Sequence, residues 1–286
     1  MAWTSAQTTV FSKILSAYIQ KNLVAKQFVD YSWISDAVRN KVVTINALTA
    51  PSIYTYSAGM GTISGSEVAY TSQNLTMDQY KYANVSVPDL LVRTSNIVEL
   101  TPILGSIGYE LAQAQDVAIL SASSAITTGI SSAQYIGSGS SIAINNAYTE
   151  NSTSGSAYDF AVNLGVKLDA SHTPKQNRYM VAPSWYIAQM AKDDRFTLNS
   201  PEIRATGVIG QVAGMTVLQS ESVIVKSGIT EVIAVHQSCM AGAFGLESVE
   251  TLRSENDFAT KLRSLAVYGI KTINPTYGAV LFARSA

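Results

Sequence analysis

The longest run of helically spaced apolar side chains lies between Thr101 and Ser124. Thr101 suits an N-cap, and Pro102 suits the first turn, where its missing N–H would have no helical partner. Glu110 and Asp116 fall off the apolar stripe. The spacing predicts a helix of about 23 residues, roughly 34 Å long, on which other elements can pack. The stripe comprises Ile103, Leu104, Ile107, Leu111, Ala114, Val117, Ala118 and Leu120.

A second helical pattern lies within residues 1–40. Intervals of three and four positions predict an amphipathic helix of about three turns, and residues 23–29 continue as a second short piece. No neighbouring element completes a domain with this segment, so we expect an arm. The pattern leaves open whether the arm docks on another subunit or on its own core. The first helix carries Val10, Phe11, Ile14, Leu15, Tyr18 and Ile19.

Strand patterns follow the arm. Residues 41–47 are rich in β-branched side chains and predict a strand. Residues 52–73 predict a long hairpin, with β-prone flanks at 52–56 and 67–71 around a tip rich in glycine and serine. The hairpin has few aliphatic residues, so we expect it to project and to need a partner surface. Residues 75–87 predict a strand that returns to the body and ends at Pro88.

The second half begins with a composition shift. Residues 129–155 are rich in Gly, Ser and Asn and mark a subdomain boundary. The following residues alternate between helical and strand patterns, which predicts a compact α/β unit. Long strand patterns then return near the C-terminus, so the chain is expected to be α+β. The predicted helices are 156–170 and 183–191, and the predicted strands are 177–182, 208–219 with a glycine turn, 231–235, 247–253, 260–273 and 278–283.

Composition suggests extensive contact with other protein. Charged residues make up 14% of the 286 residues, against about 25% in typical soluble domains. The net charge of −1 gives no overall basic balance for gripping nucleic acid. The single cysteine excludes an internal disulfide framework and a cysteine-rich zinc site. No signal peptide or membrane span is evident, and we expect a soluble intracellular chain.

Motifs for catalysis are missing. The sequence has no Gly-x-Ser-x-Gly elbow and no Gly-Lys-Ser/Thr phosphate loop. His172 and His236 lie 64 positions apart without a metal-ligand partner, and His172 is expected in a solvated loop and His236 half-buried. Cys239, three positions after His236, is expected to be a small buried hydrophobe. We therefore predict no catalytic, cofactor-binding or metal-ligating residue, and no cofactor.

The acidic residues are expected to be structural. Asp193 and Asp194 follow a short helix and are expected to be exposed. A larger group near Arg253 does not share one strand face, so it predicts a solvated or interfacial ion-pair network rather than an acid–base pair. That group comprises Glu247, Glu250, Glu255 and Asp257.

The order of these parts resembles the major capsid proteins of tailed bacteriophages, which share the Hong Kong 97-like fold with encapsulins. Local motifs agree over nearly the whole chain. Leu75–Tyr82 resembles the family's strand out of its extended loop, and 182–184 with 193–196 resembles its "VxP…L…DxRF" stretch. Residues 208–217 are similar to its "G-x-x-G-x-V" strand pair. Phe258–Leu262 and Val267–Lys271 resemble its C-terminal signature.

The resemblance implies a domain plan. Residues 1–40 would be the N-terminal arm and 51–84 the extended loop that reaches over a neighbour. The peripheral domain would be discontinuous, comprising 41–50, 85–130 and 246–286, and residues 131–245 would form the axial domain. Contacts between subunits would come from the loop and the arm. The candidate contact residues are Tyr54, Tyr56, Gly59, Gly61, Glu67, Tyr70, Phe11 and Tyr18.

The implied function is structural rather than enzymatic. The chain would assemble into hexamers and pentamers of an icosahedral virion shell, in the host bacterial cytoplasm, around double-stranded DNA without sequence-specific binding. A separate scaffolding protein and a portal protein would be its partners, and no membrane is implied. No lysine lies between Ala50 and Gln79, so we expect no isopeptide cross-link through the loop. The alternatives are an encapsulin-like compartment and a soluble enzyme with an unrecognised site.

Overall fold

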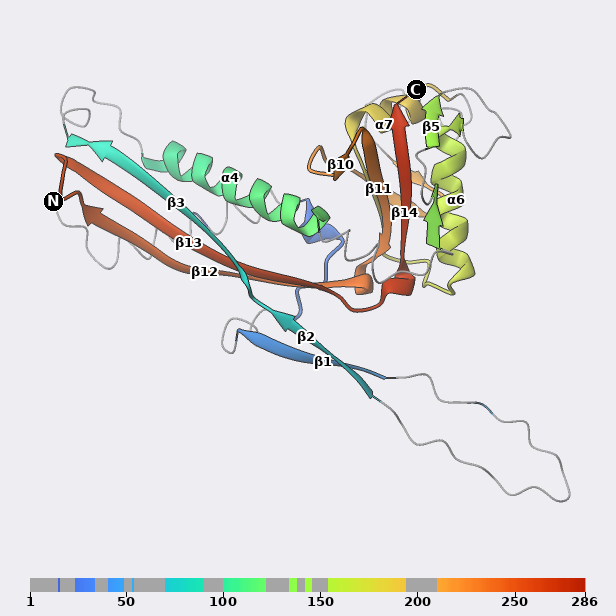
Figure 1. The fold of residues 1–286 in the computed structure, drawn as a ribbon, viewed down its shortest axis with the longest axis horizontal. Helices are drawn as coiled ribbons and strands as arrows, with labels where there is room; N and C mark the ends of the chain where they lie inside the picture. Colours follow the sequence, from blue (N-terminus) through green and yellow to red (C-terminus); the bar gives the residue numbers. More distant parts are fainter. Residues whose placement is uncertain are drawn as a thin grey trace, which may run out of the picture.

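The computed structural model describes Leu15 and residues 24–33, 41–48, 53, 70–89, 100–121, 134–137, 142–145, 154–193 and 210–285. Two units lie side by side along the long axis (Figure 1). One is a long three-stranded sheet with a helix along it, and the other is a nine-stranded sheet with two helices. A separate two-stranded hairpin extends away from the long sheet. This is the α+β architecture that the sequence predicts.

The long sheet has the order β12–β13–β3 and is antiparallel throughout. Its strands are β12 (Met240–Arg253), β13 (Ala259–Thr272) and β3 (Gln79–Pro88). Helix α4 (Leu100–Ser121) lies along one face, where Leu262 and Ala266 of β13 share a core with Leu111 of the helix. The predicted long helix is confirmed, but it begins at Leu100, so Thr101 lies in the first turn rather than at the N-cap.

The buried face of α4 is rotated from the predicted stripe. Val117, placed on that stripe, is 45% exposed, whereas Asp116 is only 4% exposed. The reason lies in the N-terminal segment, which covers the helix beside Asp116. There Phe28 and Val29 join the same core as α4, next to the short helix η1 (Ala25–Gln27). The described residues 24–33 therefore pack on the core of their own chain.

The projecting hairpin pairs strands that the sequence assigned differently. Strand β1 (Val42–Leu48) pairs with β2 (Tyr70–Thr76), in a register that runs from Val42 opposite Thr76 to Leu48 opposite Tyr70. Residues 70 and 71, expected in the flank opposite 52–56, pair instead with residues 48 and 47. Residues 49–69, apart from the exposed Ile53, lie outside the described part of the chain.

The base of the hairpin rests on the second face of the long sheet. Val43, Ile45 and Leu75 form one buried cluster with Ala243 of β12 and Val267 of β13. The predicted strand 75–87 is broken at residues 77–78, where β2 ends and β3 begins. The body of the sheet is thus held between α4 on one face and the hairpin base on the other.

The second unit is a mixed sheet with helices α6 (Ala157–Ala170) and α7 (Ser184–Ala191) packed on one face. Both helices match the prediction, and Ser156 caps α6 by accepting from the N–H of Tyr158. The main path of the sheet is β6–β5–β14–β11–β7–β9–β8, with β4 and β10 at its sides. Its strands are β4 (Tyr135–Ile136), β5 (Ile142–Asn145), β6 (Ser154–Ser156), β7 (Arg178–Ala182), β8 (Gln211–Val212), β9 (Met215–Gln219), β10 (Val225–Lys226), β11 (Ile229–His236) and β14 (Gly278–Ser285).

Strand β14 corrects one part of the predicted domain plan. The sequence placed residues 246–286 in the peripheral unit, but β14 pairs with β11, β4 and β5 in the nine-stranded sheet. Conversely, β12 begins at Met240, so residues 240–245 belong to the long sheet rather than to the axial unit. Strand β14 lies in the nine-stranded sheet because the turn at 274–277 leads the chain out of the long sheet after β13. The other domain boundaries remain predictions.

One glycine of β13 is required by close backbone packing. A Cβ atom on Gly269 would meet the carbonyl oxygen of Thr76 and lie 2.7 Å from its carbon and 2.9 Å from the Cα of Met77. Those neighbours are backbone atoms at the joint of β2 and β3, which cannot rotate away. Gly269 therefore lets the hairpin base lie directly on the sheet.

We predict that Gly269→Ala lowers the free energy of unfolding of the purified subunit by about 1–3 kcal/mol, the usual cost of overpacking. Urea unfolding followed by circular dichroism measures the change. Ser86→Ala, at an exposed position of β3, is the control and should leave stability within about 0.5 kcal/mol of the native chain. Equal stabilities for the two variants would contradict the packing argument.

Candidate subunit interface

The side chains considered for metal binding are the His, Cys, Asp and Glu residues in the described part of the chain. Within them, no group of three or more His, Cys, Asp or Glu side chains is placed to hold a metal ion. His172 is exposed, and Cys239 is fully buried, with burial raising the pKa of its thiol to about 12. Both placements agree with the sequence analysis. No helix in the described part of the chain is long and apolar enough to cross a membrane.

Two acidic predictions need correction. Asp193 is buried rather than exposed, because its carboxylate accepts a hydrogen bond from the Ser156 hydroxyl at 2.6 Å, beside the start of α6. Arg253 was expected to pair with the acidic residues around it in sequence. It instead pairs with Asp89, which follows β3, through two hydrogen bonds of 2.7 and 2.5 Å. The antiparallel register brings these residues together across 164 positions of sequence.

Asp116 anchors the N-terminal segment to α4. Its two carboxylate oxygens accept hydrogen bonds from the backbone N–H groups of Val24 and Ala25, at 3.0 and 3.1 Å. These are donors at the start of η1 that would otherwise be buried without a partner. Burial raises the pKa of Asp116, and the two hydrogen bonds oppose that shift. Burial and the charge of Asp116 also raise the pKa of Tyr31.

The same segment then reaches the edge of the long sheet. The N–H of Asp30 donates to the carbonyl of Met240 at 2.9 Å, and the N–H of Gly242 donates to the carbonyl of Asp30 at 2.9 Å. This isolated parallel bridge joins Asp30 to β12 beside Ala241. Residues 24–33 are therefore a strap that ties α4 to the sheet edge.

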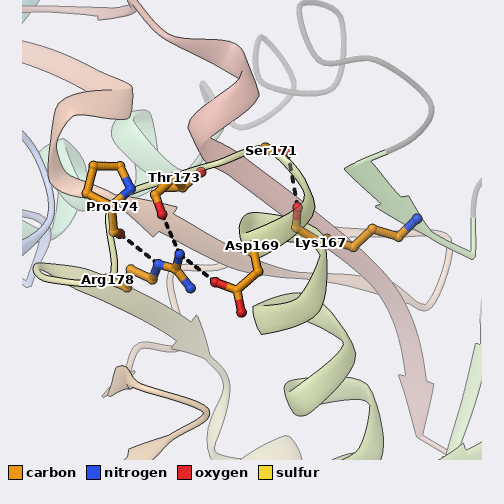
Figure 2. Close-up of polar contacts among 6 residues, drawn as sticks. All are labelled: Lys167, Asp169, Ser171, Thr173, Pro174 and Arg178. Carbon is orange, nitrogen blue, oxygen red and sulfur yellow. Dashed lines mark hydrogen bonds and ion pairs between the residues drawn. The ribbon is translucent and has the colours of Figure 1, made fainter.

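A buried arginine fixes the loop after α6. Arg178 is only 3% exposed. Figure 2 shows its side chain pointing toward the turn that contains Thr173 and Pro174. Its guanidinium donates to the carbonyls of Thr173 at 2.6 Å and Pro174 at 2.8 Å, and it pairs with Asp169 at 2.8 Å. Because three acceptors surround the cation, the role of Arg178 is to hold this loop closed against the end of the helix.

The two units join beside this arginine. The chain passes from β11 to β12 through η3 (Gln237–Cys239) and returns from β13 to β14 through η4 (Pro275–Tyr277). The two crossings are linked, because the N–H of Ile273 donates to Cys239 at 2.9 Å and the Asn274 amide donates to Ser238 at 3.1 Å. The His236 ring contacts the Ser238 hydroxyl at 2.7 Å and packs edge-on against Tyr277.

Exposed aromatic side chains lie on strands β2 and β3, away from the junction of the two units. Tyr70, the one predicted contact residue within the described part, is exposed at the outer end of the hairpin. The other predicted contacts lie outside the described residues, namely Tyr54, Tyr56, Gly59, Gly61, Glu67, Phe11 and Tyr18. Those seven contacts remain predictions.

Sequence reasoning missed two exposed tyrosines on β3. Tyr80 is exposed and Tyr82 is 79% exposed, and both lie on the face of the long sheet opposite α4. The alternation of Tyr80, Tyr82, Asn84 and Ser86 on one face of the strand was the available signal. An aromatic edge strand with one open face is a surface suited to binding protein.

We predict that Asp116→Ala destabilises the subunit by about 1–3 kcal/mol, because it leaves buried backbone donors of the strap without acceptors. Hydrogen exchange should show faster exchange at residues 24–33 than in the native chain. Glu110→Ala, exposed on the same helix, is the control. Unchanged exchange in the strap of Asp116→Ala would contradict the anchoring role.

The junction should also respond to pH. Burial first, and the nearby Arg178 charge second, lower the pKa of His236. Because the pKa is lowered, the folded state favours the neutral ring. The neutral ring therefore contributes stability at pH values above the ordinary histidine pKa of about 6.5, and this contribution is lost as the pH falls below about 6.5. We therefore expect unfolding titrations between pH 7.5 and 5 to show a loss of stability that His236→Gln removes. His172→Gln should leave the loss in place, and a loss that both variants retain would contradict the assignment.

Comparison with solved structures identifies the fold. A structure of Mycobacterium phage Che8 matches with a TM-score of 0.65 at 21% identity, over 91% of this chain and 90% of that one. The capsid structure of the cyanophage P-SCSP1u matches with a TM-score of 0.60 at 14% identity, over 86% and 84%. An encapsulin of Synechococcus elongatus PCC 7942 matches with a TM-score of 0.56 at 11% identity, over 85% and 82%.

No family model and no curated protein matches the sequence. The structural likeness extends over 85–91% of this chain and 82–90% of each matched chain, at 11–21% identity. This confirms the predicted resemblance at the level of architecture. The chain has the Hong Kong 97-like fold that phage capsid proteins and encapsulins share.

Proposed function

We propose that this chain is the major capsid protein of a tailed bacteriophage and that it assembles into hexamers and pentamers of an icosahedral shell around double-stranded DNA. The observation that carries the proposal is the match to phage capsid structures. It covers 91–92% of this chain and 87–90% of the matched chains. The matched structures include phage capsids and an encapsulin complex, so the proposal contains no enzymatic step.

The surface supports assembly. The long sheet leaves one face of β3 open with Tyr80 and Tyr82 exposed, and the hairpin carries the exposed Tyr70 away from the body. A two-stranded hairpin is marginally stable alone, so its outer part gains stability from a neighbouring subunit. Many weak contacts of this kind, repeated by symmetry, are sufficient to close a shell.

The near-zero net charge of the chain supports the proposal that the shell encloses DNA without binding it tightly. A net charge of −1 provides little attraction for the phosphate backbone, so the wall can enclose DNA without binding it tightly. A separate scaffolding protein would guide assembly, and a portal protein would occupy one vertex. The site of action would be the virion capsid, after assembly in the host cytoplasm.

An encapsulin-like compartment is the second candidate, because an encapsulin and a virus-like particle of Pyrococcus furiosus also match the fold. The contents of the particle separate the two functions. Purified particles should be treated with nuclease, opened and assayed for protected DNA and for a second protein. Protected double-stranded DNA of uniform length supports the capsid, whereas a stoichiometric cargo protein without DNA supports the compartment.

The extended hairpin should be needed for shell closure. We predict that replacing residues 56–66 with a four-residue Gly/Ser linker leaves a folded subunit that forms no closed shells, because β1 and β2 remain paired while the outer part is lost. Circular dichroism checks the fold, and light scattering with negative-stain microscopy checks assembly. An eleven-residue Gly/Ser replacement is the length-matched control for side-chain contacts. Normal shells from the shortened variant would contradict the role.

A further inference from the structure

The far end of the long sheet carries an exposed phenyl ring. Phe258 lies in the turn between β12 and β13 and is 87% exposed. Figure 1 shows this turn at the end of the sheet farthest from the nine-stranded unit. Glu255 and Asp257, in the same turn, are also exposed. The tip of the sheet is therefore an apolar knob with acidic neighbours, which we call the Phe258 tip (residues 254–258).

The tip is held in place by the body of the sheet. The N–H of Asp89 donates to the carbonyl of Phe258 at 2.9 Å, and the carboxylate of Asp89 accepts hydrogen bonds from Nη1 and Nη2 of Arg253. The N–H of Ser254 donates to the carbonyl of Ala259 at 2.9 Å and closes the turn. Because its backbone is already ordered, Phe258 can be buried by a partner with little loss of backbone entropy.

A matching hollow lies on the open face of the same sheet. It has a volume of about 400 Å³, and a cavity of about 150 Å³ already accepts a benzene ring. The strand register places Tyr82 beside Leu265 on one level and Asn84, Arg263 and Glu250 side by side on the next. Tyr82 and Leu265 supply apolar walls, and Arg263 supplies an exposed cation. The lining residues are Tyr82, Asn84, Glu250, Arg263, Ser264 and Leu265.

Charge favours the hollow over a second tip as the partner. Two tips would bring Glu255 and Asp257 of both copies together, and like charges repel. Among the side chains that the structure describes, the open face beside the hollow carries two cations, Arg263 and Lys261, and one carboxylate, Glu250. The acidic tip and the more basic face are complementary, which is the arrangement that gives specificity at protein interfaces.

The tip cannot reach the hollow of its own chain. Ala259 pairs with Pro88, whereas Leu265 pairs with Tyr82, and six residues of strand span about 20 Å. The tip and the hollow are also parts of one rigid sheet. Any contact between them must therefore join two copies of the chain.

We infer that Phe258 of one subunit inserts into the Tyr82–Leu265 hollow of a second copy, with Glu255 or Asp257 paired to Arg263. The contact joins two different patches, so it is heterologous and can repeat around a closed assembly. The inference rests on the proposed shell function and adds to it a defined contact outside the extended loop and the arm.

Paired cysteines test the contact directly. Phe258→Cys and Tyr82→Cys are combined in one chain, whose natural Cys239 is fully buried. A disulfide needs Cα atoms within about 7 Å, so oxidation of assembled shells should give covalent ladders of subunits on a non-reducing gel. The matched control combines Phe258→Cys with Tyr109→Cys, an exposed position on α4, and should give no ladder.

Shells seen by microscopy without a ladder from the Phe258/Tyr82 pair would overturn the inference and leave the proposed function standing. A ladder of equal strength from the control pair would also overturn it. Failure of the native chain to form shells, with or without co-expressed scaffold, would count against the proposed function itself.

Truncation of the ring provides a second readout. Phe258→Ala should reduce the yield of closed shells at least tenfold while leaving the circular dichroism spectrum unchanged, because the ring is exposed in the single subunit. Phe258→Leu keeps an apolar knob and should restore most of the yield. Native yields from Phe258→Ala would contradict the inference.

Discussion

The fold depends on β13, the central strand of the long sheet. Its alternating side chains face two different partners, since Leu262 and Ala266 pack toward α4 while Val267 packs against the base of the β1–β2 hairpin. Its backbone pairs with β12 on one side and β3 on the other. Gly269 allows the hairpin base to approach without a side chain between them. A change at this strand therefore affects the packing of both α4 and the hairpin base on the long sheet.

This arrangement explains why functional surfaces lie at the periphery. The part of the long sheet around Val267 and Gly269 is covered on both faces, η3 and η4 are hydrogen-bonded at the junction, and the strap is anchored to α4 through Asp116. Exposed aromatic residues remain where these covers end, at Tyr70 on the hairpin, Tyr82 on β3 and Phe258 at the tip. A well-packed body with exposed aromatic side chains at its ends is suited to repeated contacts between copies of the chain.

Local patterns in the sequence were sufficient to predict the helices α4, α6 and α7 and most strands of the second half. The misassignments that change the architecture involve contacts between distant residues. Strand β1 pairs with β2, which follows it after residues 49–69. Strand β14 pairs in the nine-stranded sheet, although it directly follows the long sheet in sequence. Asp116 is buried by a segment about 90 positions earlier. Periodicity reports which residues share a face, but it does not report what covers that face. For the same reason, Tyr82 and Phe258 could not be recognised as exposed from their residue types alone.

A cryo-electron microscopy reconstruction of particles formed by the purified chain, with co-expressed scaffold where needed, tests the central claim most directly. The account predicts a closed icosahedral shell in which nine-stranded units surround the five-fold and six-fold axes. It also predicts that the hairpin and the open face of the long sheet contact neighbouring subunits. Particles with another symmetry, or subunits whose hairpins and open sheet faces contact only solvent, would contradict it.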